Sequence, residues 1–167
     1  MSFVRIFLGL LCAVAALAAC GGHATPEYTA ALQNPGYGTA PAPDAGLAAA
    51  LKTATDANKR VLVIFGADWC PDCRKLGADL KVGRLAALPQ QDFVVVKVDV
   101  GNFDRNLAFT HRFGAPLSEG IPAVAIIDAQ DHITHVANAR ELAAALEQRD
   151  AKVIEYFERL KRMSFRG

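Results

Sequence analysis

Cysteine is scarce in this sequence, and neither sign of charge prevails. Only four cysteines occur among 167 residues, and two of them, Cys12 and Cys20, lie within the first 20. The 18 basic residues are nearly matched by 17 acidic ones. A net charge near zero argues against nucleic acid or an acidic surface as a partner. No internal repeat is present, and the length suits one domain with a full core.

Beyond its first residues the chain has no apolar run long enough to suggest a membrane span. Residues 1–19 place Arg5 before an uninterrupted apolar stretch from Ile6 to Ala19. This layout is typical of a secretory signal peptide. The stretch is also short for a spanning helix, which usually needs about 20 apolar residues. We therefore expect an exported protein.

Cys20 ends this stretch in the sequence LAAC and is followed by Gly21 and Gly22. An aliphatic residue, two small residues and a cysteine resemble the lipobox of bacterial lipoproteins. The resemblance implies cleavage before Cys20 and lipidation of that cysteine, and several acyl chains suit stable anchoring. Without an acidic residue after Cys20, the outer membrane is favoured over the inner one, with the protein facing the periplasm. The alternatives are a plain signal peptide or an uncleaved anchor.

Loss of the signal peptide leaves little cysteine chemistry. Cys12 departs with residues 1–19 and Cys20 becomes the anchor, so Cys70 and Cys73 are the remaining thiols. The exported domain then holds no separate structural disulfide, although its compartment permits disulfides to persist. The redox state of this pair becomes the central question.

Two segments are expected after the cleavage of the signal. Residues 20–43 are rich in Gly, Pro, Ala and Thr, without apolar periodicity, and predict a lipidated flexible tether of roughly 25 to 30 Å. Residues 44–167 predict the folded domain, in which strands alternate with helices, as in an α/β sheet. Expected strands lie at 60–67, 92–100, 121–128 and 129–136, and expected helices at 44–59, 74–88, 104–114 and 138–162.

Cys70 and Cys73 stand where a strand is expected to meet a helix. A helix N-terminus favours a thiolate, the form in which cysteine is a nucleophile. Pro71 suits the first helical turn, because its missing N–H is not needed there. Cys73 then lies one turn deeper on the same face. In this arrangement Cys70 can attack a disulfide and Cys73 can resolve the mixed disulfide.

Three stretches around these cysteines resemble the thioredoxin superfamily. They are GADWCPDC (66–73), VVKVDV (95–100) and EGIPAV (119–124), in the family's order and within residues 44–136. The resemblance is strongest to periplasmic, membrane-tethered thioredoxin-like proteins. It implies a thioredoxin fold, with a central mixed sheet of about four strands flanked by helices and an extra C-terminal helix. It also implies a cis proline at Pro122, and Lys97 near the buried thiol.

The function that the resemblance implies is thiol–disulfide exchange on the disulfides of exported proteins. Cys70 would be the nucleophile and Cys73 the resolving thiol, joined in a redox-active disulfide. Ile121 and Pro122 would align the substrate backbone, and Trp69 would form an exposed rim. No cofactor or metal is expected, because the electrons travel in the disulfide. The expected partners are exported thiol proteins and a redox partner protein, and the chain is expected to be a monomer.

Two positions depart from the family pattern or bias the chemistry. Ile64 stands where thioredoxins carry a buried aspartate that helps to move the proton of the resolving cysteine. Asp68, Asp72 and Lys97 are the available substitutes. Asp72 also disfavours the Cys70 thiolate, which leans the prediction toward a reductase or isomerase rather than a strong oxidant. Arg74 and Lys75 act in the opposite direction, and ordinary surface solvation explains these charges equally well.

Rival interpretations use the same cysteines. A structural zinc site needs four ligands, and His132 and His135 could add two, but residues three apart in a strand point to opposite faces. Copper binding is a stronger alternative, because soft thiolates select Cu(I), although the wider cysteine spacing and dedicated histidine of copper-binding relatives are not evident. A binding module with incidental thiols is the third.

A polar cluster follows the second expected strand. Its members are Asn102, Asp104, Arg105 and Asn106. They fit the lining of a substrate surface, and they fit a capping loop equally well. Both interpretations stay open at this point.

Overall fold

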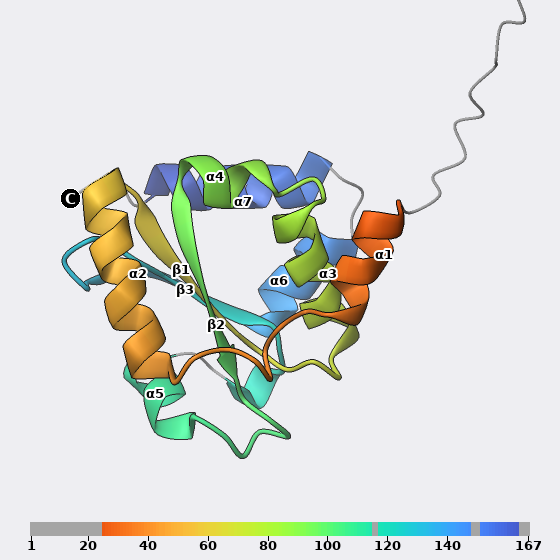
Figure 1. Ribbon diagram of the computed structural model, residues 1–167, viewed down its shortest axis with the longest axis horizontal. Coiled ribbons are helices and arrows are strands. Elements are labelled where there is room, and N and C mark those ends of the chain that lie inside the picture. Colours follow the sequence, from red (N-terminus) through yellow and green to blue (C-terminus); the bar gives the residue numbers. More distant parts are fainter. Residues whose placement is uncertain (1–24, 115–116, 148–150, 164–167) are drawn as a thin grey trace, which may run out of the picture.

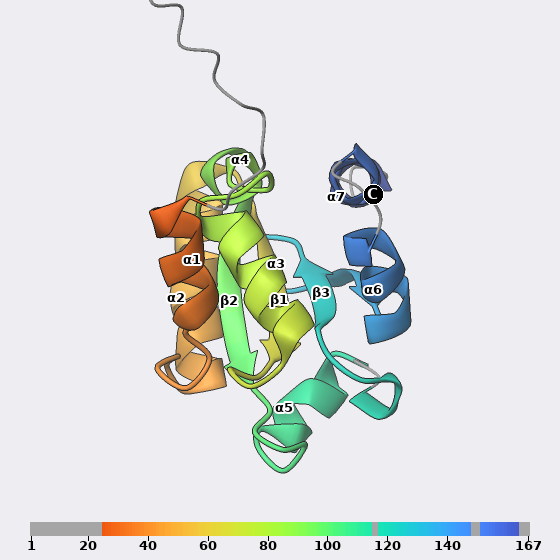
Figure 2. The same ribbon diagram turned by 90° about the vertical axis from the view of Figure 1, so that its right-hand side faces the viewer.

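The structure is a computed structural model that describes residues 25–114, 117–147 and 151–163. The expected signal peptide and Cys20 lie outside these residues. Helices surround a central sheet on both faces (Figures 1 and 2). The elements are α1 (Pro26–Gln33), α2 (Pro43–Ala57), β1 (Arg60–Gly66), α3 (Pro71–Lys81), α4 (Ala87–Gln91), β2 (Phe93–Asp99), α5 (Leu107–Arg112), the 3-10 turn η1 (Leu117–Glu119), β3 (Ala123–Ile127), β4 (Ile133–Ala137), α6 (Ala139–Glu147) and α7 (Ala151–Met163).

The sheet has four strands in the order β2-β1-β3-β4. β1 pairs parallel with β2 and antiparallel with β3, and β3 pairs antiparallel with β4. The parallel pair needs a crossover, which α3 and α4 supply between β1 and β2. This is the predicted α/β class with a mixed sheet of four strands, and the thioredoxin fold is confirmed.

β1 occupies the centre of the molecule. All seven of its residues are buried, as its run of apolar and β-branched side chains predicts. Successive residues of a strand point to opposite faces, so the two faces of the sheet can be assigned. A Cβ on Gly46 of α2 would lie 3.8 Å from Val96, whereas one on Gly77 of α3 would lie 3.4 Å from Lys97 Nζ. Helices α2 and α3 therefore cover opposite faces.

Residues 25–42 differ from the flexible tether that was expected over 20–43. Pro26–Gln33 form helix α1, capped by the Thr25 hydroxyl, which accepts a hydrogen bond from Tyr28 N. Ala31 and Tyr37 are buried. The expectation failed because α1 has little amphipathic pattern of its own, and packing on α3 orders it. For its described part, the tether is corrected to a piece of the folded domain.

Four contacts hold this N-terminal segment, defined here as residues 25–42. Tyr28 Oη donates to Asp79 at 2.7 Å, and Arg74 Nε donates to the Leu32 carbonyl at 2.7 Å. The other two contacts are a hydrogen bond from Lys97 Nζ to the Pro35 carbonyl, and paired backbone donors from Tyr37 and Gly38 to the Asp68 carboxylate. Because Tyr28 meets the end of α3 and Leu32 its beginning, α1 runs antiparallel to α3 (Figure 2).

The C-terminal region contains two helices where one interrupted helix was expected. α6 ends at Glu147 and α7 begins at Ala151, and the Asn138 side chain accepts a hydrogen bond from Glu141 N at the start of α6. Phe157 and Leu160 of α7 are fully buried, so this helix belongs to the core. Within the described ranges, no helix is long and apolar enough to cross a membrane.

Candidate active site

Cys70 lies at the N-cap of α3, directly after the loop that follows β1. Its sulfur accepts a hydrogen bond from the backbone N–H of Cys73 at 3.2 Å, and Pro71 takes the first helical position. Both cysteines are free thiols and are buried, with Cys73 the deeper of the two. The chain thus places one thiol at the mouth of the site and the other beneath it.

The pKa values of the two thiols move apart. A hydrogen bond with the Cys73 side chain is the largest cause that lowers the pKa of Cys70 to about 7, and the Cys73 backbone N–H adds to it. Burial and the charge of Asp72 oppose this shift. The pKa of Cys73 is raised far above its ordinary value, because that thiol keeps its proton in the hydrogen bond with Cys70 and is desolvated. Cys70 is therefore the thiol that ionises near neutral pH.

The peptide bond between Ile121 and Pro122 is cis, as the resemblance implies. The Ile121 carbonyl lies 3.5 Å from Cys70 Sγ and accepts a hydrogen bond from that thiol. Ile121 and Pro122 are themselves buried at the start of β3. The loop before β3 thus faces the N-terminus of α3 across the site.

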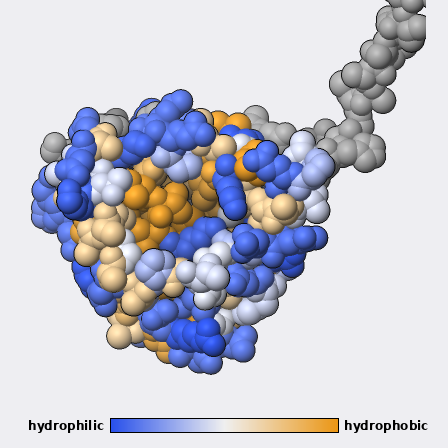
Figure 3. All heavy atoms as spheres, viewed as in Figure 1, coloured by the Kyte–Doolittle hydropathy of each residue, from blue (hydrophilic) through white to orange (hydrophobic). Residues whose placement is uncertain are grey.

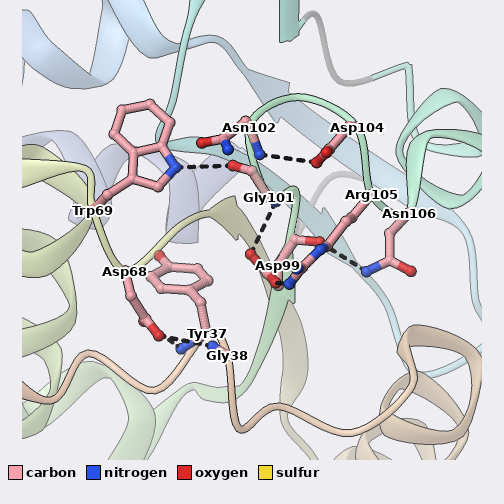
Figure 4. Close-up of polar contacts among 10 residues, drawn as sticks. All are labelled: Tyr37, Gly38, Asp68, Trp69, Asp99, Gly101, Asn102, Asp104, Arg105 and Asn106. Carbon is pink, nitrogen blue, oxygen red and sulfur yellow. Dashed lines mark hydrogen bonds and ion pairs between the residues drawn. The ribbon is translucent and has the colours of Figure 1, made fainter.

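Trp69 forms an exposed rim beside Cys70. Its side chain is 52% exposed, which places it at the surface and not in the core. The indole Nε1 donates to the Gly101 carbonyl at 2.9 Å (Figure 4). Phe103, also exposed, meets the indole edge-on with ring centroids 6.1 Å apart. An apolar surface therefore borders the reactive thiol.

The polar cluster after β2 caps its own loop and also lines a crevice. Asp104 accepts a hydrogen bond from Asn102 N, Arg105 pairs with Asp99 at 2.8 Å, and Asn106 donates to the Asp99 carbonyl (Figure 4). Asn102, Asp104 and Arg105 line a crevice with Trp69 and Asp68. The capping interpretation is confirmed for this loop, and the substrate-surface interpretation stays a prediction.

Two of the three candidate proton-relay residues have another role. Asp68 accepts the backbone N–H groups of Tyr37 and Gly38 at 2.8 and 2.9 Å. The ammonium of Lys97 donates to the Pro35 carbonyl and lies over the Tyr37 ring, 5.4 Å from its centroid. Burial lowers the pKa of Lys97. These two side chains fasten the N-terminal segment to the domain, and Asp72 remains exposed on the first turn of α3.

Tyr37 is a residue of the site that sequence reasoning missed. Its side chain is 1% exposed, and its ring extends from the loop toward the segment that carries Asp68 and Trp69 (Figure 4). The only signal available in the sequence is a lone aromatic residue within NPGYG, in a stretch that otherwise reads as coil. Nothing local predicts its burial.

The two histidines of the zinc hypothesis belong to the edge strand β4 and to the turn before it, whereas the cysteines follow the central strand β1. β3 separates β4 from β1, so His135 in β4 is distant from the loop that carries Cys70. The His132 ring lies 3.0 Å from the Asp128 carboxylate in the turn before β4. Among the residues that the structure describes, no three His, Cys, Asp or Glu side chains gather in a group suited to a metal ion.

A separate hollow lies over β2, away from the thiols. Figure 3 shows apolar side chains gathered in it, between α2 and the N-terminal segment. Val94, Val95, Ala49 and Pro41 are among its lining residues, and neither cysteine is. The chemistry of the thiols therefore belongs to the rim at Trp69 and not to this hollow.

The fold and the thiol pair at the start of α3 are both typical of thioredoxin-like proteins. The family model described as thioredoxin-like matches residues 42–129, and the chain belongs to that family. The membership supports thiol–disulfide oxidoreductase chemistry at the level of the family.

Solved structures give the particular likenesses. A structure described as disulphide isomerase from Xylella fastidiosa Temecula1 is 35% identical, with a TM-score of 0.66, over 72% of this chain and 92% of the other. The C-terminal domain of DsbD from Neisseria meningitidis, in its oxidised form, is 22% identical over 70% of this chain and 94% of the other, with a TM-score of 0.47. No curated protein matches the sequence.

Proposed function

We propose that the protein is a thiol–disulfide oxidoreductase that acts on exported protein disulfides. The Cys70 thiolate attacks one sulfur of a substrate disulfide and forms a mixed disulfide with it, while the other substrate sulfur leaves and takes up a proton. Cys73 then loses its proton and attacks Cys70 Sγ, and the substrate sulfur bonded to Cys70 leaves and takes up a proton. The substrate disulfide is reduced, and the Cys70–Cys73 pair is oxidised. A redox partner protein restores the dithiol, and no cofactor takes part.

The observation that carries this proposal is the position of Cys70 between two elements. Its sulfur accepts the Cys73 N–H at the start of α3 and contacts the Ile121 carbonyl before Pro122. An approaching peptide would find an exposed aromatic rim at Trp69 and a buried backbone turn on the other side. The likeness to a structure described as a disulphide isomerase supports the same reaction class.

The proposed direction is reduction or isomerisation and not strong oxidation. Strongly oxidising pairs have a nucleophile with a pKa of about 3.5, whereas about 7 is typical of thioredoxins. The pKa of Cys70 is about 7, and the charge of Asp72 contributes in the direction that disfavours its thiolate. A less stabilised thiolate accompanies a disulfide that is a weaker oxidant.

The proposed location is the periplasmic side of a membrane, with Cys20 lipidated and the outer membrane favoured. Six residue steps separate Cys20 from Pro26, so the link spans at most about 20 Å. Helix α1 begins beside Asp79, near the end of α3, and Cys70 stands at the other end of that 11-residue helix. A short anchor at the start of α1 would therefore turn the thiols away from the lipid, toward partners in the periplasm.

Trapping of mixed disulfides tests the function directly. The Cys73→Ser variant keeps the nucleophile but cannot resolve, so we expect it to accumulate adducts with exported proteins in a bacterial host. The adducts should disappear on reduction and be absent from a Cys70→Ser control, which is matched in size and polarity. The purified wild type should also reduce insulin disulfides in the presence of dithiothreitol.

Two results would contradict the proposal. If neither an adduct nor turnover is observed while the protein remains folded, the chain is a binding module with incidental thiols. If the reduced protein instead takes up one equivalent of Cu(I) tightly and shows no turnover, the copper alternative prevails.

A further inference from the structure

Ile64 of β1 is an apolar residue at a position where thioredoxins carry an acid. At this position the family resemblance expects a carboxyl group beneath the resolving thiol, and Ile64 is fully buried and apolar. Ile64 pairs with Lys97 across β1 and β2, so both side chains point to the sheet face that α3 covers. Gly66, two residues further along β1, presents the same face. A polar group above Gly66 would therefore lie next to the position where the family resemblance implies a carboxyl group.

The side chain above Gly66 is Tyr37. A Cβ on Gly66 would lie 2.6 Å from Tyr37 Cζ and 2.7 Å from its hydroxyl oxygen, so only glycine leaves room for the phenol. The hydroxyl is buried and, within the described part of the chain, has no hydrogen-bond partner. Burial of a hydroxyl without a hydrogen-bond partner is unfavourable, so the presence of this group calls for an explanation.

Contacts of neighbouring groups place the phenol on the Cys73 side of α3. Cys73 and Gly77 are four residues apart and share one face of this helix. A Cβ on Gly77 would lie 3.4 Å from Lys97 Nζ and 3.9 Å from the Pro35 carbonyl. Lys97 in turn lies over the ring of Tyr37. The N-terminal segment thus lies along the helix face that carries the resolving thiol.

We infer that the Tyr37 hydroxyl donates a hydrogen bond to the Cys73 sulfur when that sulfur carries negative charge. Tyr37 is then a positioning residue for the resolving thiol, supplied by the N-terminal segment in place of a carboxyl group on β1. In the resting dithiol, Cys73 interacts with Cys70 and the hydroxyl stays unpartnered. The interaction is made chiefly at the transition state, which is where it accelerates a reaction.

The electrostatics of the phenol agree with this geometry. Burial raises the pKa of Tyr37 well above its ordinary value, and negative charge on Cys73 adds to the increase, ahead of Cys70 and Asp68. A phenol in this state keeps its proton at all physiological pH values. It therefore acts as a hydrogen-bond donor and does not deprotonate Cys73 itself. This distinguishes it from a carboxylate, which can accept the proton.

The step to test is the reduction of the oxidised protein by dithiothreitol, which needs no protein substrate. A dithiothreitol thiolate attacks Cys70 Sγ, the Cys70–Cys73 bond breaks, and Cys73 leaves as a thiolate and takes up a proton. The second dithiothreitol thiol then displaces Cys70. Trp69, the single tryptophan, adjoins the site and reports the change by fluorescence. This readout is independent of the proposed function, whose failure would appear only with protein disulfides.

We expect Tyr37→Phe to slow this reduction about tenfold, the typical effect of removing one hydrogen bond to a charged group. In the Cys70→Ser background, the same substitution should shift the pH dependence of the rate of Cys73 alkylation to higher pH. Alkylation of Cys70 in the Cys73→Ser background should change less than twofold. Thermal stability should be retained or increased, because the removed hydroxyl has no partner.

Tyr28→Phe is the matched control, since it removes a phenol hydroxyl from the same segment at the far end of α3. That hydroxyl binds Asp79, so its loss should lower stability and leave the reduction rate unchanged. Reduction of Tyr37→Phe at the wild-type rate, with an unshifted Cys73 profile, would overturn the inference. Equal slowing by both variants would also overturn it, because the effect would then be one of packing.

Discussion

At the scale of single residues, the site depends on where charge lies around two sulfurs. Hydrogen bonds with Cys73 lower the pKa of Cys70 to about 7, and the charge of Asp72 acts to raise that pKa. Asp72 stands in the first turn of α3, where a negative charge stabilises the helix but disfavours a neighbouring thiolate. One carboxylate therefore stabilises the helix and lowers the fraction of Cys70 that is ionised.

Asp72→Asn tests this effect through pH dependence. Removal of the charge should lower the pKa of Cys70 below about 7, so the thiolate persists to lower pH. At pH 6 the rate of Cys70 alkylation by iodoacetamide should rise roughly two- to threefold, as expected for a partly screened charge. Asp44→Asn, in the first turn of α2, is the control. An unchanged or raised pKa in Asp72→Asn would contradict the assignment.

At the scale of elements, the N-terminal segment is held by a buried acid. Asp79 is 3% exposed and accepts hydrogen bonds from Tyr28 Oη and Arg84, with Lys75 3.9 Å away. It therefore joins α1 to the end of α3. A short helix such as α1 is marginal in isolation, so its order depends on contacts of this kind.

Asp79→Ala should reduce the free energy of unfolding by about 3 kcal/mol, because it removes the charged acceptor of the hydrogen bonds from Tyr28 and Arg84. Tyr28→Phe, which removes one of those donors, should cost about 1 kcal/mol. Urea unfolding followed by far-UV circular dichroism measures both. Asp56→Asn, which breaks an exposed pair with Lys52, should change stability by less than about 0.5 kcal/mol. A loss in Asp79→Ala no larger than in this control would show that Asp79 does not hold the segment.

At the scale of the whole molecule, the N-terminal segment makes the domain larger than its family core. The family model begins at residue 42, yet the described fold begins at residue 25. The segment lies beside α3 (Figures 1 and 2), and its Tyr37 is buried over Gly66 of β1. Attachment at Cys20 would therefore act on a folded element next to the site and not on a loose linker.

Limited proteolysis of the protein tests this boundary. Chymotrypsin cuts after large apolar and aromatic residues, and residues 25–42 offer Tyr28, Leu32 and Tyr37. These sites should resist cleavage in the native protein and be cut readily in urea, since cleavage needs local unfolding. The Asp79→Ala variant should be cut faster than the wild type. Rapid native cleavage at Tyr28 or Tyr37 would mean that the segment is a coil.

Local patterns in the sequence were sufficient for much of the fold. The apolar, β-branched run at 60–67 predicted β1, and the order of strands and helices predicted the α/β class. Cys70 before Pro71 predicted the N-terminus of α3, because capping preferences act over a few residues. The GIP stretch predicted the turn into β3 by resemblance. Each of these features depends on neighbours that are close in the chain.

The surroundings of Tyr37 were decided by tertiary structure alone. NPGYG has no apolar period, and its order depends on Asp68, about 30 residues away, on Lys97, about 60 away, and on the space above Gly66. Such contacts form only after β1, β2 and α3 are packed, so no short window of sequence contains them. The sequence by itself determined which two cysteines stand at the start of α3, because a helix cap is set by neighbouring residues. The packed fold decided that the Tyr37 hydroxyl is buried over Gly66, because that contact joins distant parts of the chain.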